Sequence, residues 1–282
     1  NICIYAMLND DHRVYDSYLT SGPFFDDNGY LTIRTIKLFL DGALGSRGAA
    51  LLRPYYDDPE NTGIILLNTQ QAINKVKKFN GAGFQVSIHC IGDRANRIGL
   101  HIFETVGERK LRNRIEHAQI LHPNDIKRFA EIGVIPSMQP AHCTSDMYWI
   151  NKRLGANRLN EVCNWQSLLT SGTIIAGGSD APVESPDPLS GIYAAVTRKD
   201  KAGSPTDGWR GHERLTIEQA LLMYTQWPAY ASFLENTRGK IKPGFQANFT
   251  VLSKNLISVQ PEDILKTKVL FTIVNGKVVY AE

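Results

Sequence analysis

The fold of this chain is decided by residues 84–95, which read FQVSIHCIGDRA. The segment up to Ile88 has the apolar pattern of a short strand, and His89 stands at its carboxyl end. Gly92 interrupts the strand, and Asp93 is a candidate N-cap for a following helix. The stretch therefore predicts a strand, a turn and a helix that together present one histidine at a strand end.

The same pattern recurs twice further along the chain. Residues 114–118 read RIEHA and place His117 at a strand end, and residues 174–182 read IIAGGSDAP and place Asp180 there. In a parallel α/β barrel the carboxyl ends of the strands converge on one mouth, so residues distant in sequence can meet. For a single histidine, a strand end satisfied by backbone contacts is the simpler interpretation. Three metal-competent side chains at successive strand ends instead favour a metal-hydrolase mouth.

Helical and strand-like patterns alternate along most of the chain. Helices are predicted over residues 69–81, 93–106, 123–132 and 161–171. Six strands are predicted near Ile4, Ile36, Val86, Ile115, Ile135 and Ile175. Long loops at 41–67 and 138–157 are expected at the mouth. A barrel of eight strands needs two more, which are expected to precede Asn1. The predicted fold class is an α/β TIM-type barrel, incomplete at its N-terminus.

The last part of the chain changes character. Several short strand-like runs follow Gly239, and Asn275-Gly276 is typical of a hairpin turn. We therefore predict a barrel domain over residues 1–236 and part of a small C-terminal β-sandwich over residues 237–282.

Composition is that of an ordinary globular protein, with 43% hydrophobic and 21% charged residues. The net charge of +3 is too small to indicate binding to nucleic acid or to an anionic membrane. No run approaches the about 18 apolar residues of a membrane span, and the first residues do not resemble a signal peptide. The cysteines lack C-x-x-C spacing, so reduced thiols in a cytoplasmic protein are the simplest account. Cys90 is expected to pack against a helix, because neighbouring strand residues face opposite ways.

The residue types at the strand ends suit hydrolytic metal chemistry. Neutral imidazoles, as at His89 and His117, and carboxylates are ligands that zinc uses. A metal-bound water has a pKa of about 7, and a carboxylate beside it, here Asp180, can take its proton. Lys37 lies near the end of a strand-like run and fits as a ligand only if carbon dioxide converts its amine into a carbamate.

Five motifs, in this order, resemble the signatures of the amidohydrolase superfamily, and most closely its family-3 branch of metal-dependent hydrolases. They are residues 36–47 (IKLFLDGALGSR), 89–95 (HCIGDRA), 114–119 (RIEHAQ), 139–142 (QPAH) and 178–183 (GSDAPV). The resemblance covers nearly the whole chain and implies a (β/α)8 barrel of which strands three to eight are present. It also implies metal-dependent cleavage of amides, cyclic amides and related C–N or ester bonds in a small-molecule substrate.

The resemblance implies roles for individual residues. Lys37 corresponds to the carboxylated lysine of strand four, and His89 and His117 correspond to the metal ligands of strands five and six. Asp180 corresponds to the aspartate of strand eight, which is both a ligand and the general base. The implied cofactor is one or two divalent metal ions, with zinc favoured. Two further residues are candidates for substrate contact. Arg47 either holds an anionic group of the substrate or pairs with Asp41, and His142 either hydrogen-bonds to the substrate or is a solvated loop residue.

One departure from the superfamily concerns its first strand, which carries His-x-His. No two of the seven histidines in this chain have that spacing. Three interpretations therefore stay open: one metal held by Lys37, His89 and His117, no metal, or a catalytically inactive barrel fragment that binds a small molecule or a partner. Because an incomplete barrel exposes strand edges, a homodimer is also considered. Glu116 is expected to face the helices unless it supports a metal ligand from behind.

Overall fold

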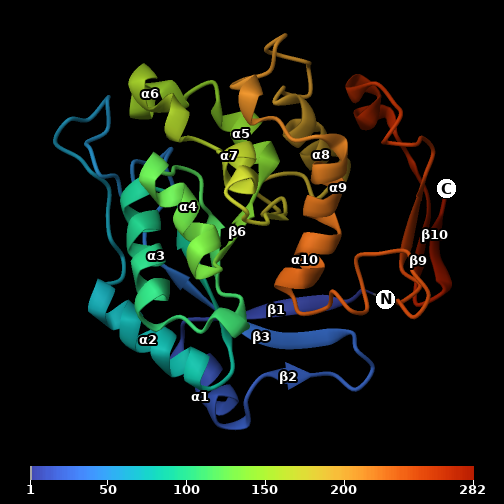
Figure 1. The fold of residues 1–282 in the computed structure, drawn as a ribbon, viewed down its shortest axis with the longest axis horizontal. Helices are drawn as coiled ribbons and strands as arrows, with labels where there is room; N and C mark the ends of the chain where they lie inside the picture. Colours follow the sequence, from blue (N-terminus) through green and yellow to red (C-terminus); the bar gives the residue numbers. More distant parts are fainter. Residues whose placement is uncertain (1) are drawn as a thin grey trace. The chain divides into compact units, whose positions relative to one another are not determined.

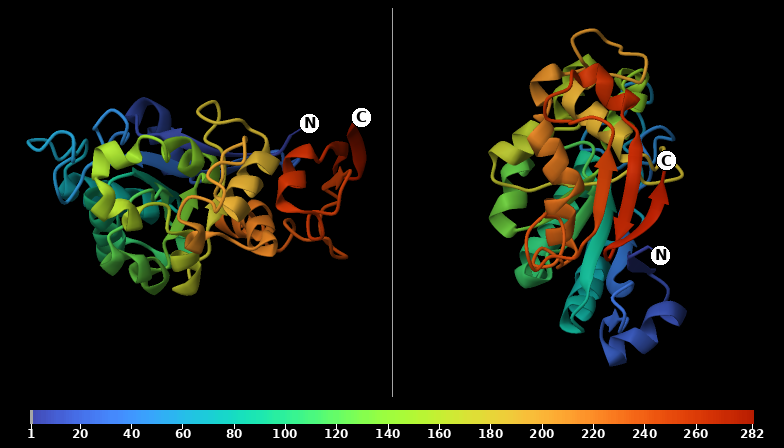
Figure 2. Two further views of the ribbon diagram at one scale, coloured as in Figure 1. Left: turned by 90° about the horizontal axis from the view of Figure 1, so that it is seen from above. Right: turned by 90° about the vertical axis from the view of Figure 1, so that its right-hand side faces the viewer.

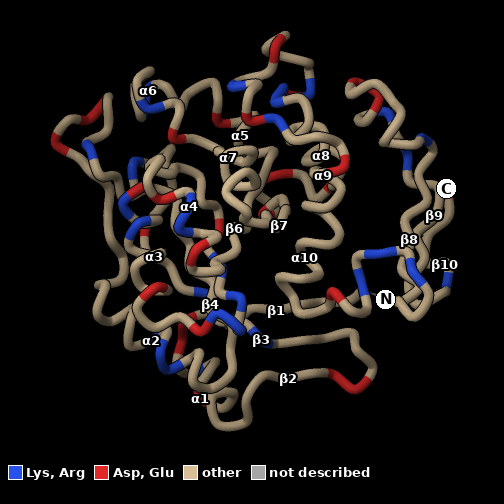
Figure 3. The backbone as a smooth tube through the Cα atoms, viewed as in Figure 1, with Lys and Arg blue, Asp and Glu red and all other residues tan. Residues whose placement is uncertain are grey.

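The computed structural model describes residues 2–282, and the chain forms two compact units. The larger unit contains residues 3–138 and 148–174, and the smaller unit contains residues 139–147 and 175–282. Figure 1 shows the elements of both units, and Figure 3 shows that basic and acidic positions are interspersed along the chain in each. Within the described residues, no helix is long and apolar enough to cross a membrane.

A parallel sheet forms the centre of the larger unit. Its strands are hydrogen-bonded in the order β1 (Ile4–Asn9), β3 (Leu31–Phe39), β4 (Gln85–Cys90), β5 (Arg114–His117) and β6 (Ile135–Met138). The short strand β2 (Phe24–Phe25) pairs with β3 in the antiparallel direction. Because each parallel pair needs a crossover connection, the strands alternate with helices as the sequence predicts.

Helices of the larger unit pack along the sheet. They are α1 (His12–Ser21), α2 (Thr69–Gly81), α3 (Asp93–Val106), α4 (Pro123–Ile132), α6 (Ile150–Leu154) and α7 (Trp165–Thr170), with short 3-10 turns η1 (Arg109–Leu111) and η2 (Ala156–Glu161). Helix α2 packs on α3, α3 on α4 and α4 on α7, and α2 and α3 also contact β4 (Figure 1). A Cβ on Gly99 of α3 would lie 3.0 Å from the Sγ atom of Cys90. Cys90 therefore faces a helix, which confirms the prediction.

The smaller unit combines helices with an antiparallel sheet. Its elements are α5 (Pro140–Asp146), β7 (Ala176–Gly177), α8 (Pro188–Thr197), η3 (Gly211–Glu213), α9 (Ile217–Tyr224), α10 (Gln226–Ala231), β8 (Phe249–Leu252), η4 (Pro261–Lys266), β9 (Val269–Val274) and β10 (Lys277–Ala281). Strands β10, β9 and β8 are neighbours in this order, as the red strands of Figure 2 show. Asn275 and Gly276 both have positive φ, at 49° and 75°, which confirms the predicted hairpin turn.

The α/β class, the curled parallel sheet and the separate antiparallel sheet agree with the predicted fold. The predicted loop at 138–157 is wrong in part, because α5 and α6 form there. Pro140 follows the extended residue Gln139 and occupies the first turn of α5, a position that proline favours. Helix α3 begins at Asp93, so its N-cap is Gly92 rather than Asp93. The TIM-type barrel that lacks its first two strands and the domain boundary at residues 236–237 stay predictions.

Candidate functional site

Lys37 and His89 lie on the same face of the parallel sheet. In the register between β3 and β4, Lys37 pairs with Ser87, and Phe39 pairs with His89. Because side chains alternate along a strand, Lys37 and Phe39 share one face with Ser87 and His89. Val86, Ile88 and Cys90 of β4 occupy the other face and are fully buried. The two residues that the sequence predicts as metal ligands on these strands are therefore on the face away from the helices.

His117 joins this group across the next strand pair. The ring centroids of His89 and His117 lie 4.6 Å apart, with an angle of 70° between the ring planes. His117 ends β5 with φ at 72°, outside the range of a regular strand. Glu116 precedes it and hydrogen-bonds to Ser87 from the same face of the sheet. Regular alternation would separate Glu116 from His117, and the left-handed backbone at the strand end allows both to lie on this face.

His89 is held as a neutral imidazole. Burial lowers the pKa of His89 to about 3, with the nearby His117 and Lys37 acting in the same direction. A neutral ring is the form that binds metals. Its Nε2 atom is buried and has no hydrogen-bond partner within residues 2–282, and it lies 3.5 Å from Oδ1 of Asp41.

Asp41 is a buried acid that the sequence indicated as the end of a strand and as a possible partner of Arg47, and not as part of the site. Its carboxylate accepts hydrogen bonds from the backbone N–H groups of Ala50 (2.9 Å), Ile91 (3.0 Å) and Gly92 (2.8 Å). Burial raises the pKa of Asp41 to about 7, against the opposing effect of these three donors. The sequence feature that indicates Asp41 is its position just after the strand that carries Lys37.

Glu116 is the second buried acid of this region. It accepts a hydrogen bond of 2.5 Å from Oγ of Ser87, and its Oε1 atom lies 3.1 Å from Nε of Arg114. Burial alone would raise the pKa of Glu116, but Arg114, Lys37 and hydroxyl hydrogen bonds from Ser137 and Ser87 together lower it to about 2. Glu116 is therefore ionised, and it shares a face of the sheet with Ser87 instead of facing the helices.

Arg47 lies in the irregular segment after β3. Its guanidinium forms a paired contact with Asp57, at 3.2 Å from Nε and 3.0 Å from Nη2. Arg153 binds the same carboxylate and also donates to the carbonyl of Gly45 at 2.8 Å. The predicted pairing of Arg47 with Asp41 is therefore wrong, because Asp57 takes the guanidinium and backbone N–H groups take the carboxylate of Asp41. Contact of Arg47 with substrate stays a prediction.

Asp180 and His142 belong to the smaller unit. Asp180 follows β7, has φ at 55° and is exposed. Burial lowers the pKa of His142, although the carboxylates of Asp180 and Glu184 oppose this shift. His142 is therefore neutral and lies within electrostatic reach of Asp180. The roles of Asp180 as ligand and base, and of His142 in substrate binding, stay predictions.

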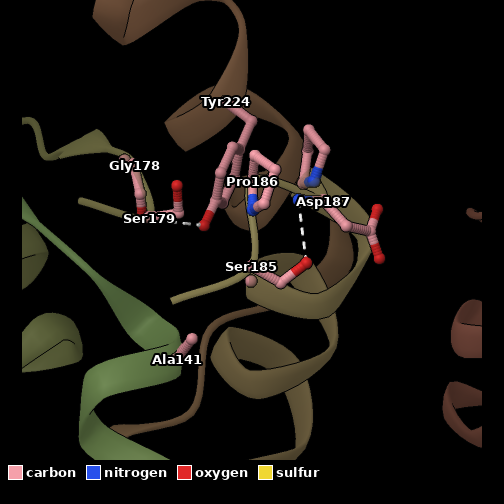
Figure 4. Close-up of a pocket in the computed structure, with 10 residues that line it drawn as sticks. Ala141, Gly178, Ser179, Ser185, Pro186, Asp187 and Tyr224 are labelled. Carbon is pink, nitrogen blue, oxygen red and sulfur yellow. Dashed lines mark hydrogen bonds between the residues drawn. The ribbon is translucent and has the colours of Figure 1, made fainter. Parts of the chain in front are cut away.

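A small cavity of about 180 Å³, lined by Ser179, lies in the smaller unit (Figure 4). Its lining consists mainly of small residues and prolines: Ala141, Gly177, Gly178, Ser179, Ser185, Pro186, Asp187, Pro188, Gly191 and Tyr224. The hydroxyl of Tyr224 lies 3.4 Å from the carbonyl oxygen of Gly178. Burial raises the pKa of Tyr224, so this hydroxyl is neutral. The wall of the cavity combines small and apolar residues with the side chains of Ser179, Ser185, Asp187 and Tyr224.

The residues of the larger unit suit a divalent metal in part. No group of three or more His, Cys, Asp or Glu side chains that could hold a metal ion is found among residues 2–282. The imidazoles of His89 and His117 do lie together, and Nε2 of His89 is buried without a hydrogen-bond partner among these residues. A carbamate on Lys37 would add an oxygen ligand on the same face. Imidazole nitrogens and a carbamate oxygen are donor types that a divalent metal uses, so these residues are compatible with a metal site.

A parallel α/β sheet that carries a histidine pair at its strand ends is typical of barrel-type metal-dependent hydrolases. The sequence model of family 3, described as the Amidohydrolase family, matches residues 8–280. The chain belongs to the amidohydrolase family. This confirms the resemblance that the motifs indicated.

Individual relatives agree with this assignment. Amidohydrolase YtcJ of Bacillus subtilis is 35% identical over 261 residues, which is 92% of this chain and 48% of the relative. The N-substituted formamide deformylase of Arthrobacter pascens is 29% identical over 249 residues, or 87% of this chain and 45% of the relative. An uncharacterized metal-dependent hydrolase from Pyrococcus horikoshii OT3 superposes with a TM-score of 0.80 at 33% identity, covering 93% of this chain and 52% of that one. The chain thus spans about half the length of these relatives.

Proposed function

We propose that this chain is part of a metal-dependent amidohydrolase that cleaves the C–N bond of an amide or cyclic amide in a small molecule. The observation that carries the proposal is the His89–His117 pair, with His89 buried and neutral. Membership of the amidohydrolase family supports hydrolysis, and the name of the Arthrobacter pascens relative supports an amide-type bond.

Lys37, as a carbamate, and the two histidines would hold one or two divalent ions, with zinc favoured. Such an ion would lower the pKa of a bound water and would polarise the carbonyl of the scissile bond. Asp180 would act as a further ligand and as the general base, which takes a proton from water and returns it to the leaving nitrogen. Ionised Glu116 would support the metal ligands through its contacts with Ser87 and Arg114.

The cavity lined by Ser179 supports a small substrate. Its volume of about 180 Å³ is below the about 300 Å³ at which pockets for drug-sized ligands begin. Ser179 and Ala141, which line it, are the sequence neighbours of Asp180 and His142. We therefore propose that an uncharged substituent of the substrate occupies this cavity, with His142, and Arg47 more weakly, contacting polar groups. The four cysteines are free thiols, which supports a cytoplasmic location.

An activity screen tests the proposed reaction. The purified chain, loaded with Zn²⁺, is offered N-substituted formamides, linear amides and cyclic amides, and release of amine is measured. We expect turnover of at least one class, and a loss of more than about 100-fold in kcat in Asp180→Asn, because a general base contributes about 10²–10⁴-fold. Asp207→Asn is the matched control, since Asp207 is an exposed acid in a loop of the same unit.

The same screen separates this proposal from the alternative, a catalytically inactive barrel that binds a small molecule or a partner. A chain that holds its metal stoichiometrically but releases amine from no substrate class would contradict amide hydrolysis and favour the binding protein.

A further inference from the structure

The carboxylate of Asp41 joins two loops at the strand ends that carry the metal-competent residues. Asp41 is 1% exposed and is the second residue after the end of β3. Its three backbone donors come from the segment after β3, at Ala50, and from the turn after β4, at Ile91 and Gly92. Asp41 is therefore fixed relative to both strand ends.

The acceptor positions of this carboxylate are not all used. A carboxylate offers about four lone-pair positions on its two oxygens. Oδ2 accepts from Ala50 and Gly92, whereas Oδ1 accepts from Ile91. Oδ1 thus keeps an open position, and it is the oxygen that lies 3.5 Å from Nε2 of His89.

The histidine atom that faces Asp41 also lacks a hydrogen bond. Nε2 of His89 is enclosed by protein and has no hydrogen-bond partner in the part of the chain that the structure describes. A buried polar atom without a partner costs free energy. A hydrogen bond to Asp41 needs an N–O distance of about 3.0 Å, so the two groups must approach each other from 3.5 Å. The ring also has a backbone hydrogen-bond partner at Gly42.

We propose that Asp41 is a positioning residue of the metal centre, and that its Oδ1 atom accepts a hydrogen bond from the Nε2–H group of His89. This bond fixes the tautomer and the orientation of the ring, so that Nδ1 is the nitrogen left to bind metal. Carboxylates that hold the second nitrogen of a metal-bound histidine in this way commonly change metal affinity by 10–100-fold. The inference rests on the proposed function, because it requires His89 to be a ligand.

A purely structural role is the competing explanation. The two loops approach closely, since a Cβ on Gly92 would lie 2.0 Å from the carbonyl oxygen of Ala50. Asp41 would then serve only to clamp them. Asp93 provides a matched control, because it is equally buried and accepts hydrogen bonds from Leu52 and Arg94 in the same two segments. Asp93 pairs with Arg158 rather than with a histidine.

The test compares Asp41→Asn and Asp93→Asn in the whole chain. Three quantities are measured: the thermal unfolding temperature without metal, the Zn²⁺ affinity by competition with a chelator, and the visible spectrum of the Co²⁺-loaded chain. We expect both variants to lower the unfolding temperature, but only Asp41→Asn to weaken Zn²⁺ binding, by about 10–100-fold, and to change the Co²⁺ spectrum. Equal Zn²⁺ affinity and unchanged spectra in both variants would overturn the positioning role.

A second measurement does not depend on any variant folding. In the unmutated chain labelled with ¹⁵N-histidine, Zn²⁺ is expected to shift the Nδ1 resonance of His89, while Nε2 keeps its proton. A Zn²⁺-dependent shift of Nε2 with loss of its proton would overturn the inference while leaving the proposed function intact. If Zn²⁺ shifts no resonance of His89 at all, the proposed ligand set fails, and the inference fails with it.

Discussion

His89 and His117 come from different strands, yet their rings meet at 4.6 Å and nearly at right angles. The contact depends on the end of β5, where φ at His117 is 72° and φ at the following Ala118 is 44°. Such values are uncommon for residues other than glycine, and strained backbone of this kind clusters at functional sites. The pair is therefore the part of the larger unit on which the proposed metal centre depends.

The buried pair of Glu116 and Arg114 predicts a strong effect on stability. Glu116→Ala leaves the guanidinium of Arg114, which is 6% exposed, without its carboxylate. Removing one partner of a buried ion pair costs about 3–5 kcal/mol, so urea unfolding should show a loss of that size. The double variant Glu116→Leu/Arg114→Met should recover most of it, because no uncompensated charge stays buried. A loss below about 1 kcal/mol in the single variant would show that the pair behaves as a surface contact.

The close approach of Gly92 to Ala50 predicts that no side chain is tolerated there. A Cβ at position 92 would lie 2.0 Å from the carbonyl oxygen of Ala50, which is backbone and cannot move aside alone. Gly92→Ala should therefore destabilise the chain by about 1–3 kcal/mol or more, as overpacking does. Gly81→Ala is the control, since a Cβ there meets nothing within 4 Å. Equal unfolding midpoints for the two variants would contradict this reading of the loop.

The contacts of Asp57 predict a pH dependence of stability. Burial alone would raise the pKa of Asp57, but hydrogen bonds from Arg47 and Arg153 outweigh it and lower the pKa. The stabilisation should be complete above the unfolded value of about 3.9 and should be lost as the pH falls through the lower folded value. The difference in unfolding free energy between the parent and Asp57→Asn should thus shrink between about pH 5 and the acid limit of folding. A difference that is independent of pH would contradict the ion pairs.

The exposed edge of the parallel sheet predicts that the chain associates with a second copy of itself. β1 is the first strand of the sheet order, and it exposes Ile4 (51%) and Met7 (39%). Exposed strand edges of this kind pair with other chains. Light scattering should show a homodimer, and Ile4→Lys should weaken it, whereas Ile257→Lys, at an exposed position of the smaller unit, should not. Only monomer at high concentration would rule out the dimer.

Local patterns sufficed to predict much of the larger unit. Helices α2, α3 and α4 have the residue ranges expected from their periodicity, because each begins or ends at a recognisable cap or glycine. The strands that carry His89 and His117 were also recognisable, because β-branched residues precede each histidine and Gly92 or Ala118 follows within three residues.

The missed features depend on contacts between distant segments or on unusual backbone. Asp41 binds N–H groups of residues 91 and 92, and nothing in the local sequence shows that contact. The orientation of Glu116 depends on the positive φ of His117, which a period of two cannot reveal. The strand expected near Ile175 is reduced to Ala176–Gly177, and nothing in the local sequence explains why residues 173–175 do not join it.

Metal content tests the central claim most directly. The purified chain is loaded with Zn²⁺, dialysed and assayed for bound metal, beside His89→Ala, His117→Ala and the control His101→Ala, whose histidine is exposed on α3. We predict that His101→Ala keeps the metal of the parent chain and that the other two variants lose it. Metal retained in full by both His89→Ala and His117→Ala would contradict the assignment of this pair as ligands.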